Sequence, residues 1–93
     1  MDIDAIIRRG VAAERLLSDE TVMTALGDIE RDLITDWASS RPTDMEGREG
    51  IFRLVKALEL FQSKLEIWRD TGKLEKAKLQ RNMDDQRQMS PQA

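Results

Sequence analysis

The sequence predicts an all-α protein, built as a long antiparallel helical hairpin with an N-terminal helix packed across it. Apolar side chains in residues 51–68 recur at alternating spacings of three and four, the rhythm of one helical face. Charged residues make up 35% of the chain and aromatic residues only 4%, which is unlike the composition of a sheet protein. Two further segments, near residues 3–17 and 19–38, repeat the helical spacing. Three helices therefore account for most of the chain.

The segment after Gly50 is the strongest helix signal, and it carries apolar side chains on two lines. The first line consists of Ile51, Leu54, Leu58, Phe61, Leu65 and Trp68. The second line consists of Ala57, Leu60, Ile67 and Leu74. At about 3.6 residues per turn the two lines span an arc of roughly 200°, which is wider than one partner helix covers. We therefore expect the second line to be an interface between copies of the chain; a single three-helix core is the alternative.

The N-terminal segment predicts a helix capped by Asp2, whose carboxylate can accept a hydrogen bond from a backbone amide of the first turn. Its buried line would be Ile3, Ile6, Gly10, Ala13 and Leu17. The small side chains at Gly10 and Ala13 allow another backbone to approach closely. We expect that backbone to belong to the chain's own long helix; a tight crossing with another subunit is the alternative.

A second helix is expected over residues 19–38, with Ser18 as its N-cap. Trp37, near its end, is interpreted as a plug in the core. Asp28, Asp32 and Asp36 are expected on the face opposite the buried line, where like charges four residues apart destabilise a helix. The side chains that could offset them are Arg31, Arg53, Lys56 and Lys64, and a divalent cation is the alternative.

The third helix should begin near Asp44, because Thr43 and Glu46 have the spacing of a capping box. Gly72 can adopt the left-handed conformation that ends many helices, so residues 44–71 are expected as one helix and residues 73–83 as a short separate one. These assignments define a single helical domain over residues 1–83. Residues 84–93 are polar and are expected to form a flexible tail.

Composition excludes several kinds of chemistry. The chain contains no cysteine and no histidine, which removes disulfides, thiol nucleophiles, Ser-His-Asp triads and nearly all zinc sites. No apolar run is long enough to span a bilayer and no signal peptide is present, so we expect a soluble cytoplasmic protein without a membrane partner. Residues 1–50 carry twelve acidic residues and six arginines, whereas residues 51–93 carry nine basic and six acidic residues. The basic positions are interrupted by acidic ones, so a nucleic-acid partner is not expected.

One acidic pattern resembles an enzyme motif. Glu46 and Glu49 form E-x-x-E, and Glu66 and Asp70 follow in the long helix. This pattern is partly similar to the all-α nucleoside triphosphate pyrophosphohydrolases of the MazG kind, and the resemblance would imply magnesium-dependent hydrolysis. The family's second motif is E-x-x-D, whereas Glu66 and Asp70 are spaced E-x-x-x-D. We therefore expect a non-enzymatic protein without a cofactor.

A second resemblance covers roughly residues 5–78. The A-A-E-R-L-L helix, the D-W ending of the second helix, the P-T-D-x-E-G-R-E turn and the long helix ending T-G-K resemble small helical proteins of tailed bacteriophages and prophages. This resemblance implies a structural or assembly subunit that acts by helix–helix contacts, alone or on a larger phage or host protein, in the virion or the host cytoplasm. The alternative is a host-defence antagonist that binds a host protein or sequesters a nucleotide signal at subunit boundaries. Its candidate ligand-binding residues are Arg8, Arg9 and Arg48.

Overall fold

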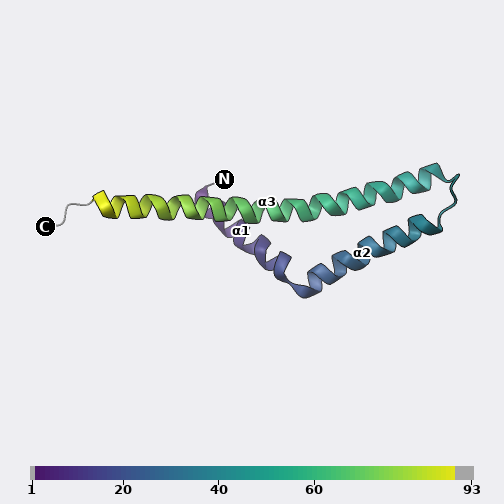
Figure 1. The fold of residues 1–93 in the computed structure, drawn as a ribbon, viewed down its shortest axis with the longest axis horizontal. Helices are drawn as coiled ribbons and strands as arrows, with labels where there is room; N and C mark the ends of the chain where they lie inside the picture. The colour runs from purple at the N-terminus through teal and green to yellow at the C-terminus, as the bar shows by residue number, and fades with distance from the viewer. Residues whose placement is uncertain (1, 90–93) are drawn as a thin grey trace.

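The computed structural model describes residues 2–89, and this part of the chain forms three helices and no strand. Helix α1 spans Ile3–Ser18, α2 spans Glu20–Ser39 and α3 spans Met45–Met89. Figure 1 shows α3 as a long rod, with α2 running back along it from the turn and α1 crossing it further on. The prediction of an all-α hairpin with an added N-terminal helix is confirmed.

The molecule is elongated. Its principal extents are 79 × 24 × 17 Å and its radius of gyration is 21.0 Å. A compact domain of this length would have a radius of gyration of about 12 Å. The three helices outline an open triangle, because α1 and α2 meet α3 at different places and diverge from it toward their shared corner.

Helix α1 packs on α3 through two glycines. A Cβ atom added at Gly10 would lie 2.9 Å from the Cα of Gly72 and 2.8 Å from the carbonyl oxygen of Trp68. The prediction that Gly10 contacts the chain's own long helix is therefore confirmed. The prediction that Gly72 ends the long helix is wrong. No glycine in the described chain has a positive φ, and α3 continues through this position. The absent side chain of Gly72 serves the crossing of two helices instead of a helix end.

Helix starts were predicted correctly in one case and one residue early in two. Asp2 caps α1 by accepting a hydrogen bond from the amide of Ala5 at 2.7 Å. Helix α2 is capped by Asp19, which accepts from the amide of Val22 at 3.0 Å, whereas Ser18 is the last residue of α1. A carboxylate is the better cap at this point, because its charge also interacts favourably with the positive end of the helix dipole.

The start of α3 also differs from the predicted capping box. Asp44, not Thr43, caps this helix, and its Oδ1 accepts a hydrogen bond from the amide of Gly47 at 3.0 Å. Gly47 leaves space for this carboxylate, because a Cβ atom there would overlap the Asp44 side chain. The first helical residue is Met45.

The far end of α3 is a single continuous helix. Residues 73–83 do not form a separate helix, and residues 84–89, expected to begin a flexible tail, are helical as well. The rest of the expected tail, residues 90–93, lies outside the described residues.

The chain has almost no core. Among the apolar side chains of residues 2–88, only Ala13 (2% exposed) and Leu65 (4%) are buried, and both lie where α1 meets α3. Trp37 is not the predicted core plug, because it is 46% exposed. The chain exposes 7591 Å², whereas a folded monomer of its mass exposes about 5,500 Å². About 2,000 Å² of surface is thus left uncovered by the chain itself.

Candidate functional site

The second apolar line of α3 forms an exposed ridge. Leu60 is 69% exposed, Ile67 53% and Leu74 52%, and Ala57 is exposed as well. The three large side chains follow one another at intervals of seven, so they form one stripe along the helix. Neither α1 nor α2 covers these three side chains, which we call the outer ridge. Ala57, the fourth residue of the predicted line, lies instead in the lining of an open groove between α2 and α3.

The space between α2 and α3 forms a second apolar surface. Beyond the turn the two helices diverge, and an open groove of about 330 Å³ lies between them. Its lining is wholly apolar and consists of Ile29, Leu33, Leu54, Ala57, Leu58 and Phe61. We call this feature the hairpin groove. Directly packed helices lie about 8–10 Å apart, and packing between α2 and α3 is much sparser than between α1 and α3.

The turn end of the hairpin is held by one arginine. The guanidinium of Arg48 stacks on the Trp37 ring at 4.3 Å from its centroid. Its Nε–H donates to the Oγ of Ser40 at 2.8 Å, and its Nη2 donates to the Ser40 carbonyl at 3.4 Å. On the other side of the turn, Leu33, Ile34 and Trp37 face Ile51, Phe52 and Val55 across a smaller apolar pocket.

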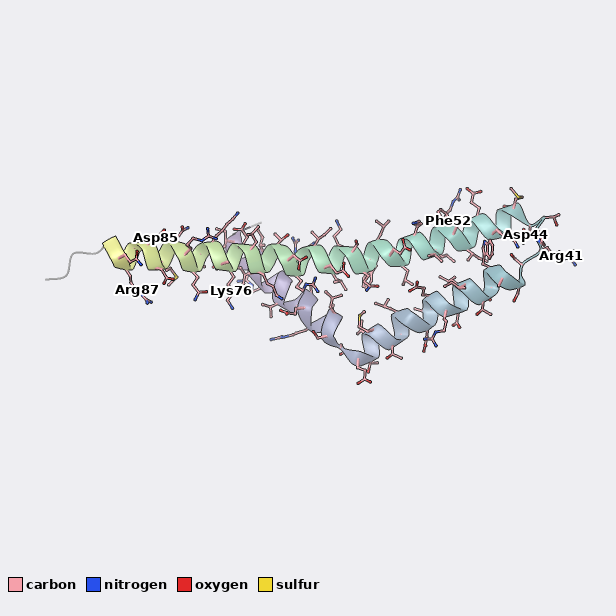
Figure 2. The ribbon with its side chains drawn as sticks, in the orientation of Figure 1. Arg41, Asp44, Phe52, Lys76, Asp85 and Arg87 are labelled. Carbon is pink, nitrogen blue, oxygen red and sulfur yellow. The ribbon has the colours of Figure 1, made fainter. Side chains whose placement is uncertain are left out.

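The last part of α3 extends past α1, and no other helix of the described chain packs on it (Figure 1). We call residues 76–88 the C-terminal arm. Leu79 and Met83 are exposed on it, flanked by Lys76 three residues earlier and Arg87 four residues later. Figure 2 shows Lys76 and Arg87 on the side of α3 where α1 and α2 lie, with Asp85 on the opposite side. The arm therefore presents an apolar face flanked by Lys76 and Arg87, with Asp84 beside it.

The three candidate ligand-binding arginines do not form one cluster. Arg9 stacks on Trp68 at 4.5 Å, at the junction of α1 and α3, and its buried Nε reaches no hydrogen-bond acceptor among the described residues. Arg48 lies at the turn, and the 20 residues of helix between it and Trp68 correspond to about 30 Å. Arg8 is exposed on α1. These three side chains therefore do not meet in one pocket of a single chain.

The acidic residues of the enzyme resemblance are also kept apart. Glu46, Glu49, Glu66 and Asp70 all lie on α3, and the 17 residues from Glu49 to Glu66 correspond to about 25 Å along one rigid helix. Across residues 2–89, no group of three or more acidic side chains is placed to hold a metal ion. The chain therefore does not assemble the two acidic motifs into one site.

The acidic stripe of α2 is only partly compensated. Arg31 pairs with Asp28 at 3.0 Å, as one of the predicted offsets. Two of the predicted partners on α3 pair within their own helix instead: Arg53 pairs with Glu49, and Lys56 pairs with Glu59. Asp32 and Asp36 have no cation within ion-pair distance in the described chain. Asp32 follows Ile29 by three residues and Asp36 follows Leu33 by three, so each is the helix-surface neighbour of a residue that lines the hairpin groove. They do not lie on the face opposite the buried line, where the sequence placed them.

Ion pairs near the α1–α3 junction are exposed and hold little energy. Lys73 reaches Glu14 of α1 at 3.1 Å, the one ion pair among the described residues that joins two helices. Arg69 donates to Asp70 at 2.9 Å, and this hydrogen bond raises the pKa of Arg69 above its ordinary value. Exposed pairs of this kind contribute about 0–1 kcal/mol. The junction therefore depends on its close glycine contact.

The hairpin groove and the arm were not singled out from the sequence. The arm did carry a usable signal, because the first apolar line continues beyond Trp68 at the same alternating spacing, through Gly72 and Glu75 to Leu79. Because Gly72 alone predicts a helix end, the local sequence assigns Leu79 and Met83 to a separate short helix and not to the arm. The groove depends on how far α2 diverges from α3, which no sequence pattern encodes.

No protein-family model, curated protein or solved structure matches this chain. Within residues 2–89, no helix combines the length and the apolar character needed to cross a bilayer.

Proposed function

We propose that this protein is a non-enzymatic, self-associating helical subunit that acts through helix–helix contacts. The observation that carries the proposal is the excess exposed surface of the single chain. About 2,000 Å² beyond the expectation for a folded monomer stays exposed. Standard protein interfaces cover about 800 Å² per partner, and obligate ones cover more. The excess is thus of the size that an obligate interface removes.

The outer ridge supports the same proposal. Leu60, Ile67 and Leu74 are large exposed apolar side chains that recur every seven residues on the uncovered side of α3. Such a stripe is typical of helices that pack side by side in oligomers. A chain with two buried apolar side chains also has too little core to stay folded alone, which is the usual condition of obligate oligomers.

The class of subunit follows from the resemblance to bacteriophage proteins. We propose a structural or assembly role, in which the multimer presents its remaining helical surfaces to a larger protein. The elongated shape supports this role, because a rod of 79 Å contacts a partner over a long distance.

The test is replacement of Leu60 and Ile67 together by glutamate, followed by sedimentation. We expect the multimer of the unaltered chain to dissociate, because charged side chains at the ridge would lose their water in the interface. Replacement of Thr21 and Thr24 by glutamate, at exposed positions of α2 away from the ridge, is the control and should leave the mass unchanged. A helical Leu60→Glu, Ile67→Glu variant of unchanged mass would show that the ridge is not the interface.

A further inference from the structure

The C-terminal arm and the hairpin groove are complementary surfaces that one chain cannot bring together. Both belong to α3, and the 18 residues from Phe61 to Leu79 correspond to about 27 Å along a continuous helix. Helix α1 occupies α3 between them. The arm of a chain therefore points away from its own groove, and only another copy can supply an arm to it.

We propose that the arm of one copy inserts its Leu79 and Met83 face into the hairpin groove of a second copy. This inference rests on the self-association proposed above and names the segments that meet. The groove has apolar walls on two helices and is open between them. A third helix seated there gives Ile29, Leu33 and Phe61 an apolar neighbour that neither α2 nor α3 can provide. It also covers Leu79 and Met83, the exposed end of the first apolar line.

Charge identifies the arm as the occupant. Helix α2 carries five acidic residues against the single Arg31, and Asp32 and Asp36 border the groove without a cation partner in the described chain. The face of the arm is flanked by Lys76 and Arg87, which have no ion-pair partner among residues 2–89 (Figure 2). Groove-to-groove pairing of two hairpins would instead bring two acidic α2 helices together, where like charges repel.

Disulfide trapping tests the placement, and the chain suits it because it contains no cysteine. A Leu33→Cys variant places one thiol in the groove and a Met83→Cys variant places one on the arm. The two variants are refolded together, oxidised mildly and resolved by mass. A disulfide requires Cα atoms closer than about 7 Å, so we expect the mixed Leu33→Cys/Met83→Cys species to exceed either homodisulfide several-fold. Asp85→Cys, on the opposite side of the arm, is the control and should not link to Leu33→Cys.

The outcomes separate this inference from the proposed function. If the unaltered chain sediments as a multimer and only Leu33→Cys or Met83→Cys homodisulfides form, the arm does not occupy the groove, while self-association stands. If the unaltered chain sediments as a monomer, both proposals fail.

Surface charge reversal gives a second test that leaves the apolar faces intact. One variant carries Lys76→Asp and Arg87→Asp, and the other carries Asp32→Lys and Asp36→Lys. We expect each alone to associate a few-fold more weakly, and an equimolar mixture to regain the affinity of the unaltered chain, because opposite charges then meet across copies. A mixture no tighter than its components would overturn the placement.

Discussion

The two junctions that α3 makes with its neighbours differ in closeness. At the α1 junction, Gly10 and Gly72 bring two backbones into contact, and the only buried apolar side chains in the described chain lie beside them. At the α2 junction, the helices meet near the turn and then diverge around the hairpin groove. Close packing therefore holds the first junction, whereas the second is held at its end by Arg48 and its partners. The α1 junction is thus closely packed within one chain, whereas the α2 junction leaves an open apolar groove.

The largest effect is expected on dilution of the protein, which tests whether the open α2 junction is completed by another copy. If the open side of α2 is covered by another copy, unfolding and dissociation are one event, and stability depends on protein concentration. We expect the helical circular dichroism signal to melt at lower temperature on dilution, with a dimer losing about 1.4 kcal/mol per tenfold. A melting temperature that is independent of concentration over three decades would show that the single chain is stable by itself.

The next largest effect concerns the glycines of α3. A Cβ atom at Gly72 would meet the backbone of Gly10 at 2.9 Å, so Gly72→Ala should force α1 away. We expect a loss of about 1–3 kcal/mol in the free energy of unfolding, typical of overpacking. Gly50→Ala is the matched control: nothing lies within 4 Å of its added Cβ, so it should stabilise the helix by about 0.5–1 kcal/mol. Urea unfolding at fixed protein concentration measures both, and equal signs for the two variants would contradict the packing role of Gly72.

These glycines also mark how far the sequence could lead. The apolar spacing predicted three helices and an exposed second line, and Leu60, Ile67 and Leu74 are indeed exposed. Gly72 could not be interpreted from local sequence, because a glycine that ends a helix and one that admits a crossing helix look alike. Which use applies depends on where Gly10 lies, 62 positions earlier in the chain. Likewise, Ser18 and Asp19 are both competent caps, and the choice between them depends on the bend from α1 into α2.

A smaller effect is expected at the turn end of the hairpin. Arg48→Ala removes the stack on Trp37 and both hydrogen bonds to Ser40. We expect a loss of about 1–2 kcal/mol, because a net hydrogen bond contributes about 1 kcal/mol and an exposed cation–π pair about 0.5–1. Ser40→Ala also removes two hydrogen bonds, the one from Arg48 Nε and its own donation to the Trp37 carbonyl, but it keeps the stack, so it should cost less. If the two variants were equally stable, the Arg48–Trp37 stack would contribute nothing to closing the hairpin.

The smallest effect expected is at the cap of α3, and it tests whether the turn is held locally. Asp44→Ala removes the acceptor of the Gly47 amide and should cost about 0.5–2 kcal/mol, as N-cap removals usually do. Thr43→Ala should be nearly neutral, since Asp44 already supplies the cap oxygen. A loss from Thr43→Ala larger than that from Asp44→Ala would instead support the capping box of Thr43 and Glu46. Neither change touches the outer ridge or the groove, so sedimentation should report the same mass for both variants. A change of mass with Asp44→Ala would mean that the start of α3, and not only its exposed apolar faces, is coupled to association.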